Sequence, residues 1–203
     1  ELSPAALDIV RKAISNKDLK WKDSAIDGKG SKITIRKSEV AWINDTNLFK
    51  MLMSVVGEIN KLTEWNLNIQ GCEPVQFGIY TEDNFYDWHV DQHNRSHDPR
   101  MHGCIRKVSM SLLMNDEFEG GELDIEIYKP GTEPRYDTIK LPKGSAVFFQ
   151  SDRWHRVRPV TKGIRKSLVA WFYGPPYTLE EIRLPKGRSR TCFTSRSSRI
   201  FFL

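Results

Sequence analysis

The sequence predicts an α+β fold in which helices near the N-terminus support a jelly-roll sandwich of short strands. Two observations lead to this prediction. Apolar residues recur at helical spacing early in the chain, and from Asn66 onward short apolar segments alternate with Gly, Pro, Asn and Asp turns. Helices followed by many short strands are typical of α+β architecture and of a jelly roll. A length of 203 residues fits one domain with a sizeable core.

Two helices are predicted before Asn66. Ser3 is a helix N-cap followed by Pro4, a residue favoured at the first helical position, and the second helix begins near Asp45 or Thr46. Each helix has an apolar stripe that is expected to pack against a sheet. The stripes consist of Leu7, Val10, Ala13 and Ile14 in the first helix, and of Leu48, Leu52, Val55, Ile59 and Leu62 in the second.

Three predicted strands carry polar side chains that point to one site. The segment 85–91 is aromatic and β-branched, and because side chains alternate along a strand, His89 and Asp91 are expected to share a face. His155 follows the strand predicted at 144–149. Arg165 opens the strand predicted at 165–172, where it shares its face with Ser167, Val169 and Trp171.

Two imidazoles and one carboxylate on one face of a metal leave roughly three of six coordination positions open, as a non-haem Fe(II) oxygenase requires. The motif His-x-Asp alone is weak, and the strand context strengthens it. The alternative left open is that His89 and His155 are ordinary strand histidines and Arg165 an edge-strand charge.

The chain from about Val75 to Tyr173 resembles the 2-oxoglutarate/Fe(II)-dependent dioxygenases, and within them the prolyl 4-hydroxylase group. Such a resemblance implies a double-stranded β-helix (jelly-roll) core with N-terminal supporting helices. The residues that carry it are Tyr80 and Tyr86 before His89, Ser109 in the strand 108–114, the turn Asn115-Asp116 with Phe118-Glu119-Gly120-Gly121-Glu122-Leu123, and the closing pair His155 and Arg165.

By this resemblance, His89, Asp91 and His155 are the iron ligands. Arg165 would hold the distal carboxylate of 2-oxoglutarate, and hydroxyl contacts would come from Tyr80, with Ser167 or Ser109. Tyr86 and Trp171 are the candidate substrate contacts. The implied cofactors and cosubstrates are Fe(II), 2-oxoglutarate and O2, with L-ascorbic acid as an additional one.

Two positions depart from the family pattern. Asp83 stands where a glycine is usual between the two tyrosines, which affects the expected shape of that loop. Arg165 stands where many prolyl hydroxylases have a lysine, and arginine preserves the charge and adds a bidentate fork.

The resemblance implies a dioxygenase that hydroxylates a C–H bond, first of all in a prolyl residue of a protein or peptide, and releases succinate and CO2. The alternatives are a hydroxylase of a free amino acid or other small molecule, and a non-catalytic binding module on the same fold. Nucleic-acid dealkylating oxygenases typically carry a second arginine six residues after the first, where this chain has Trp171.

Composition supports a reducing, cytoplasmic setting without a membrane. No apolar stretch approaches the ~18 residues of a membrane span and no signal peptide opens the chain. Three cysteines without CxxC spacing argue against disulfides or a zinc site. Six of the 31 basic side chains, and no acid, follow Ile182, so 25 basic and 26 acidic side chains remain before it. A near-neutral body disfavours nucleic acid as a partner, and composition does not indicate an oligomeric state.

We therefore expect one dioxygenase domain at 1–182, with its motif core at 75–173, and a basic C-terminal extension at 183–203. The segment Gln92 to Lys107 is polar and long, and such loops are usually lids or binding loops. It is expected to close over an extended prolyl peptide, the alternative being a solvated surface loop. Its histidines are His93, His97 and His102.

Overall fold

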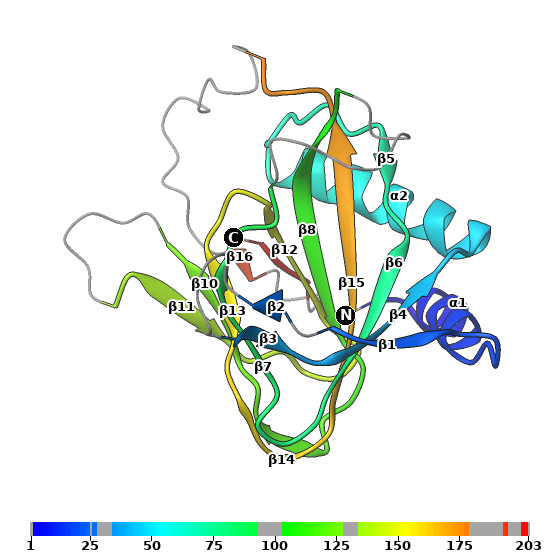
Figure 1. Ribbon diagram of the computed structural model, residues 1–203. Coiled ribbons are helices and arrows are strands. Elements are labelled where there is room, and N and C mark those ends of the chain that lie inside the picture. The colour runs from blue at the N-terminus through cyan, green and yellow to red at the C-terminus, as the bar shows by residue number, and fades with distance from the viewer. Residues whose placement is uncertain are drawn as a thin grey trace.

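The computed structural model describes residues 2–24, 26–27, 34–92, 103–127, 134–178, 193–194 and 200–202. Within them, two helices cover one face of a large sheet, and a second sheet lies on the other side (Figure 1). A third sheet of two short strands lies at the lower end of the view. The predicted α+β fold with a jelly-roll core, in which two sheets face each other, is confirmed.

Helices α1 (Pro4–Ile14) and α2 (Thr46–Leu62) begin where the capping residues predict. The Ser3 hydroxyl and the Asp45 carboxylate each accept a hydrogen bond from a backbone N–H of the first turn, at 3.2 and 2.7 Å. Each bond satisfies one of the donors that the start of a helix leaves without a partner inside the helix.

The buried stripe of α2 differs from the prediction in its second half. Val56 rather than Val55 is fully buried, and Leu62 is 72% exposed. The stripe advances in steps of four residues through Leu48 and Leu52 to Val56, so it runs obliquely across the helix, and the final residue points away from the core.

The larger sheet is antiparallel except for the pairing of β12 with β17, its seventh strand in spatial order, and it carries β5 alongside β15. Its strand order is β1-β4-β6-β15-β8-β12-β17-β16. The strands are β1 (Trp21–Asp23), β4 (Glu39–Ile43), β5 (Gly71–Cys72), β6 (Val75–Tyr80), β8 (Ile105–Leu113), β12 (Ala146–Gln150), β15 (Arg165–Gly174), β16 (Phe193–Thr194) and β17 (Ile200–Phe202).

The smaller sheet is antiparallel throughout, with strand order β11-β10-β13-β7-β3-β2. Its strands are β2 (Ile26–Asp27), β3 (Thr34–Lys37), β7 (Phe85–His89), β10 (Leu123–Glu126), β11 (Tyr136–Ile139) and β13 (His155–Val157). The two-stranded sheet consists of β9 (Phe118–Gly120) and β14 (Val160–Gly163).

The parallel pair in the larger sheet joins β12 to β17, with Ala146 opposite Ile200 and Phe148 opposite Phe202. Every other pairing in the described part of that sheet is antiparallel. The C-terminal strands β16 and β17 therefore extend the sheet beyond β12, while β8 pairs with the other side of β12.

Two apolar layers hold these elements together. One lies between the helices and the larger sheet and includes Val10, Leu52 and Phe172. The other lies between the two sheets and includes Phe149 from β12 and Ile125 from β10. The central strands of the larger sheet are therefore covered on both faces.

The inner face of the larger sheet is unusually polar for a buried surface. Along β8, Val108, Met110 and Leu112 belong to the layer under the helices, so the alternate residues point toward the smaller sheet. Those alternate residues include Ser109 and Ser111, which are buried polar side chains. Polar groups buried between two sheets indicate a candidate functional site.

The N-terminal region differs from the prediction of helices first and strands after. Four short strands, β1 to β4, lie between α1 and α2. Strand β1 is exposed along its whole length and β4 has no regular alternation of burial, so neither shows the period of two that predicts a strand.

No helix in the described part of the chain is both long enough and apolar enough to cross a membrane. The predicted loop Gln92 to Lys107 is described only at its two ends, so His93, His97 and His102 lie outside the described residues. Cys72 and Cys104 are free thiols, and Cys192 also lies outside the described residues.

Candidate metal centre

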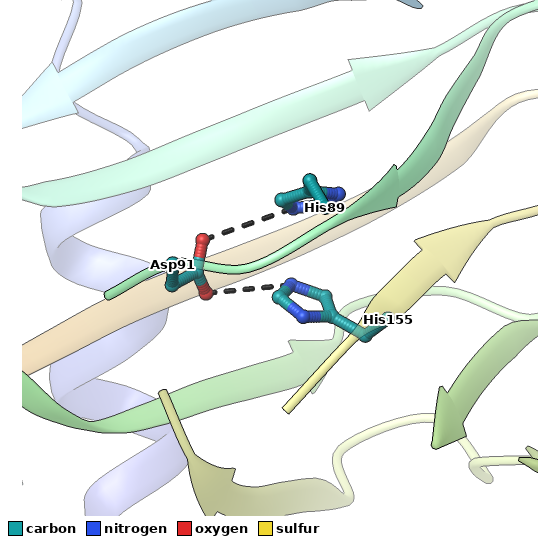
Figure 2. Close-up of side chains that lie close together, drawn as sticks. All are labelled: His89, Asp91 and His155. Atoms are coloured by element: carbon teal, nitrogen blue, oxygen red, sulfur yellow. Dashed lines mark ion pairs between the residues drawn. The ribbon is translucent and has the colours of Figure 1, made fainter. Parts of the chain in front are cut away.

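His89, Asp91 and His155 come together between the two sheets (Figure 2). His89 is the last residue of β7, and His155, the first residue of β13, pairs directly across from it. Asp91 lies two residues beyond the end of β7, so it reaches the site from the start of a loop and not from the strand that the sequence predicts. The potential ligand atoms of the three side chains all lie within 4.8 Å of one another.

The two imidazoles present the same nitrogen to the carboxylate. His89 Nε2 lies 3.7 Å from Asp91 Oδ1, and His155 Nε2 lies 3.4 Å from Asp91 Oδ2. Asp91 and His155 are each 5% exposed. This set of two nitrogens and one carboxylate is the donor set that suits a non-haem Fe(II).

The opposite ring nitrogens are held by the backbone. His89 Nδ1 lies 2.7 Å from the carbonyl oxygen of Asp87, and His155 Nδ1 lies 3.0 Å from that of Arg153. Because a carbonyl oxygen only accepts, each Nδ1 carries a proton. Nε2 is therefore the nitrogen left to bind a metal in both histidines, and the residues fit an iron ion.

The electrostatics of the group also suit a cation. Burial, and after it the neighbouring His155, lower the pKa of His89 to about 3. Burial would raise the pKa of Asp91, but His155 and His89 hold that pKa well below its usual range. For His155, burial acts to lower the pKa and is outweighed by Asp91, which raises it. Neutral His89 and ionised Asp91 are the forms that a divalent metal binds, whereas the raised pKa of His155 means that this imidazole gives up a proton when it binds one.

Arg165, the first residue of β15, is buried between the sheets at 2% exposure. Its Nη1 donates to the Ser167 hydroxyl at 3.0 Å, and its guanidinium carbon lies 5.6 Å from the centre of the Tyr80 ring. Among the described residues, its Nε has no hydrogen-bond partner and no carboxylate forms an ion pair with it. Burial lowers the pKa of Arg165 and Tyr80 partly offsets this.

An unpartnered donor on a buried cation is what a carboxylate ligand would satisfy. The residues present therefore fit the distal carboxylate of 2-oxoglutarate, and they place Arg165, Ser167 and Tyr80 together as the sequence predicts. Their roles toward the cosubstrate stay predictions.

The turn after β9 approaches Arg165 closely. Gly121 has a φ of +64°, and a Cβ atom at this position would lie 2.8 Å from Cδ of Arg165. The Gly-Gly pair of the predicted motif thus allows the backbone to pass over the arginine stem, where any side chain would push it aside. Asp83, which replaces the usual glycine of the earlier loop, has a φ of +63° and so adopts the backbone conformation that glycine favours.

Ser109 makes a contact that the sequence does not predict. Its hydroxyl donates to Asp91 Oδ2 at 2.8 Å, so its proton is used by the candidate metal ligand. A hydroxyl contact from Ser109 to 2-oxoglutarate stays a prediction, and the structure adds the contact with Asp91.

Of the two candidate substrate residues, Tyr86 contacts a candidate metal ligand, and Trp171 pairs with Ser109 across β15 and β8. The Tyr86 ring stacks on His89, with 3.4 Å between ring centres, and burial raises the pKa of Tyr86 to about 12. Trp171 is 6% exposed and lies 5.9 Å from the half-exposed ring of Trp42. Contact of either residue with a substrate stays a prediction.

Two arginines near the site were missed by the sequence reading. Arg36 of β3 lies 4.8 Å from the centre of the Tyr86 ring. Arg106 lies 4.0 Å from the centre of the Trp171 ring, forms an ion pair with Glu73 and donates to the Asp91 carbonyl oxygen at 3.5 Å. No local pattern could have found them, because their partners are distant in sequence.

A sequence profile described as the 2OG-Fe(II) oxygenase superfamily matches residues 75–173. A PKHD-type hydroxylase of Shewanella frigidimarina is 31% identical over 157 residues, which are 74% of this chain and 66% of that protein. Another, from Xylella fastidiosa, is 36% identical over 107 residues, which are 48% of this chain and 43% of that protein. The match thus covers less than two thirds of these relatives' own length.

Solved structures share the fold. A prolyl-4-hydroxylase of Pseudomonas putida superposes with a TM-score of 0.56 and 22% identity over 83% of both chains. A viral collagen prolyl hydroxylase from Paramecium bursaria Chlorella virus-1 gives 0.57 and 19% over 85% of this chain and 92% of that chain. A prolyl hydroxylase from Trichoplax adhaerens, in complex with a hypoxia inducible factor peptide fragment, gives 0.50 and 19% over 83% and 74%.

Proposed function

This chain belongs to the 2OG-Fe(II) oxygenase superfamily, and from this premise we propose that it hydroxylates a prolyl residue in a protein or peptide substrate. Membership in this family implies Fe(II), 2-oxoglutarate and O2 as cofactor and cosubstrates. The proposed reaction consumes one O2 and one 2-oxoglutarate, releases succinate and CO2, and leaves one oxygen atom on the substrate.

The observation that carries the proposal is the pairing of a metal-competent triad with an incompletely paired buried arginine between the same two sheets. His89, Asp91 and His155 would hold Fe(II), and Arg165 would hold the distal carboxylate of 2-oxoglutarate. When bound, iron and 2-oxoglutarate supply the oxidation. The protein binds and orients both, and its two sheets keep water away from the reacting atoms.

A prolyl substrate in a peptide is supported by the relatives. The chain is similar to PKHD-type hydroxylases in sequence and to prolyl hydroxylases in fold, one of them in complex with a peptide. A proline side chain offers no hydrogen-bonding group, so an enzyme that selects it gains most of its recognition from the backbone and side chains on either side. That argument favours a peptide over free proline.

The proposal is tested by anaerobic incubation with Fe(II), 2-oxoglutarate and a panel of proline-containing peptides, followed by exposure to air. Mass spectrometry should find one peptide that gains a single oxygen atom at proline, with succinate formed in equal amount. A matched peptide with alanine in place of that proline should gain none. Free proline hydroxylated as efficiently as any peptide would instead support a small-molecule hydroxylase.

His155→Ala provides the control for the metal site. Loss of one of three ligands should lower iron content sharply and abolish hydroxylation, because few ligands remain to hold the ion. Metal analysis of the purified variant and the peptide assay together check this. A variant with full iron content and unchanged turnover would show that His155 is not a ligand. In the unaltered protein, binding of 2-oxoglutarate without any turnover would support a non-catalytic binding module.

A further inference from the structure

A chain of two buried hydroxyls leads to one oxygen of the Asp91 carboxylate. Ser109 of β8 lies 2.8 Å from Asp91 Oδ2, and Ser151, in the turn after β12, lies 2.9 Å from Ser109. Both serines are 0% exposed. Hydroxyls buried so completely lose their hydration, so their mutual hydrogen bonds decide where they point.

The direction of this chain follows from counting protons. An ionised carboxylate only accepts, so the single hydroxyl proton of Ser109 goes to Asp91 Oδ2. Ser109 can therefore take part in the second contact only as an acceptor, and Ser151 donates to it. A donor that is itself receiving a hydrogen bond is polarised, which strengthens its own bond to the carboxylate.

Ser151 also holds the backbone of the same ligand. Its carbonyl oxygen accepts from the N–H groups of Asp91 and Gln92, at 3.1 and 2.9 Å. The turn that contains Ser151 continues to Arg153, whose carbonyl oxygen accepts from His155 Nδ1. One short turn thus contacts the backbone of one candidate ligand and orients the ring of another.

The contacts treat the two oxygens of Asp91 differently. Oδ2 receives the Ser109 hydrogen bond, whereas Oδ1 receives none from any residue in the described part of the chain. Figure 2 shows that the two oxygens face different histidines, Oδ1 toward His89 and Oδ2 toward His155. The Ser151 carbonyl oxygen holds the backbone N–H of Asp91, and the Ser109 hydroxyl is the contact that holds its carboxylate.

We propose that Ser109 and Ser151 are positioning residues that fix the orientation of the Asp91 carboxylate, with Ser151 acting through Ser109, so that Oδ1 is the oxygen offered to the metal. This inference rests on the proposed metal site, and it does not depend on which substrate is hydroxylated. Partners that orient a metal ligand in this way typically change metal affinity by about 10- to 100-fold when removed.

The experiment compares Ser109→Thr with Ser109→Val, since threonine and valine have nearly the same shape and differ in the hydroxyl. Binding of Fe(II) under anaerobic conditions and of Co(II) is measured by titration calorimetry, without substrate. We expect Ser109→Thr to keep an affinity near that of the unaltered protein and Ser109→Val to bind about 10- to 100-fold more weakly. The visible spectrum of bound Co(II) should change in the valine variant and be restored in the threonine variant.

Smaller variants guard against overpacking at this fully buried position. Ser109→Ala should also weaken metal binding, and Ser151→Ala should weaken it less. If Ser151 acts through Ser109, the double variant should bind no more weakly than Ser109→Ala alone. Ser111→Ala is the matched control, because Ser111 is the next residue of β8 on the same face and is also buried. Its metal affinity should be unchanged.

Equal metal affinity and equal Co(II) spectra for the valine and threonine variants would overturn the inference while leaving the metal site intact. If these bulkier variants fail to fold, Ser109→Ala is compared with the unaltered protein instead, and equal affinity and spectra in that pair would overturn the inference. If the unaltered protein binds neither Fe(II) nor Co(II), the proposed metal site fails, and the role of the two serines fails with it. An effect of Ser151→Ala that adds fully to that of Ser109→Ala would overturn the relay from Ser151 through Ser109.

Discussion

Arg165 keeps a charge in surroundings that do not balance it. Arg165 is 2% exposed, its one described hydrogen bond goes to the neutral Ser167 hydroxyl, and its Nε has no partner in the part of the chain that the structure describes. Removing a charge from water without a partner costs free energy, so this arrangement works against the stability of the ligand-free protein. A residue kept under such conditions is best explained by a ligand that supplies the missing charge.

We predict that Arg165→Ala weakens 2-oxoglutarate binding by roughly 10- to 150-fold, since a charge-assisted hydrogen bond contributes ~1.5–3 kcal/mol. Arg165→Lys should retain part of the affinity because the positive charge remains. Calorimetric titration with the metal present measures both. Normal binding by Arg165→Ala would transfer the assignment to another residue, with Lys166 the next candidate.

Arg165→Met separates the ligand role from a structural one. Methionine fills similar space without a charge, so the melting temperature of the ligand-free variant should equal or exceed that of the unaltered protein. Added 2-oxoglutarate should raise the melting temperature of the unaltered protein and leave that of Arg165→Met almost unchanged.

Residue positions in the site could be predicted from the sequence where strand alternation applied. His89, Arg165 and Ser167 lie on strands. The structure places His89 beside Asp91 and Arg165 beside Ser167. Asp91 lies beyond its strand, so its direction comes from contacts that are distant in sequence. No single-sequence pattern reveals such contacts, which is why the role of Ser151 could not be predicted.

At the scale of elements, the outer face of the smaller sheet depends on one buried acid. Asp124 of β10 is 0% exposed and accepts hydrogen bonds from Arg156, Arg158 and Thr138, at 2.7, 2.9 and 2.7 Å. Burial would raise the pKa of Asp124, but the hydrogen bonds from Arg158, Arg156 and Thr138 lower it below its ordinary value. These contacts tie β10 to β11 and β13, the strand that begins with His155.

A lowered pKa in the folded state means that ionised Asp124 stabilises the fold at any pH above the ordinary carboxyl value, near 3.8. This contribution is lost as the pH falls through the lower, folded-state pKa. We predict that Asp124→Asn is less stable than the unaltered protein by about 1–3 kcal/mol at neutral pH, since both arginines are partly exposed.

Urea unfolding from pH 7 down to pH 3 measures this prediction. The difference in free energy of unfolding between the two proteins should begin to shrink below about pH 4, because Asp124 takes up a proton there in the unfolded chain and stays ionised in the folded protein. A difference that stays constant over the whole range would show that the charge of Asp124 does not stabilise the sheet.

The turn at Gly121 is an element whose shape serves the site. An alanine there would combine a φ of +64° with a Cβ only 2.8 Å from Arg165 Cδ, so the arginine stem has to move. We predict that Gly121→Ala costs about 1–3 kcal/mol of stability and also weakens 2-oxoglutarate binding. Gly103→Ala is the matched control, with a similar φ of +72° and no atom near its Cβ, and cosubstrate binding should be unchanged in it.

Elements were predicted most reliably where capping and periodicity agreed. Both helices begin at their predicted caps, whereas strands β1 to β4 were not predicted. Strand β2 has two residues and β1 is exposed throughout, so too few residues alternate to produce a recognisable period. Their position in the sheets is set by pairing with β4, β6 and β7, which only the folded chain supplies.

At the scale of the whole molecule, the excess of basic over acidic side chains comes from one terminal segment. Six basic side chains and no acid follow Ile182, and the part of the chain before it is close to neutral. The described part of this segment forms β16 and β17, and β17 pairs with β12. We propose residues 1–182 as the catalytic domain, because the triad and Arg165 all lie before this segment.

The last prediction follows from where the segment attaches. Truncation after Tyr177 keeps the hydrogen bond from Gln92 Nε2 to the Tyr177 hydroxyl and every candidate site residue, so 2-oxoglutarate turnover without substrate should remain largely intact.

The same truncation also removes β17 and leaves β12, an apolar strand, as the edge of the larger sheet. An unpaired apolar edge invites association with another chain. The truncated protein should therefore self-associate at high concentration, and its melting temperature should fall by ~2–4 °C for each kcal/mol of pairing lost. Succinate formation, light scattering and thermal unfolding measure these effects. A full-length variant with the six basic residues replaced by glutamine is the matched control, and it should behave as the unaltered protein because its strands remain. A truncated protein that folds and yet cannot turn over 2-oxoglutarate would show that the segment belongs to the catalytic unit.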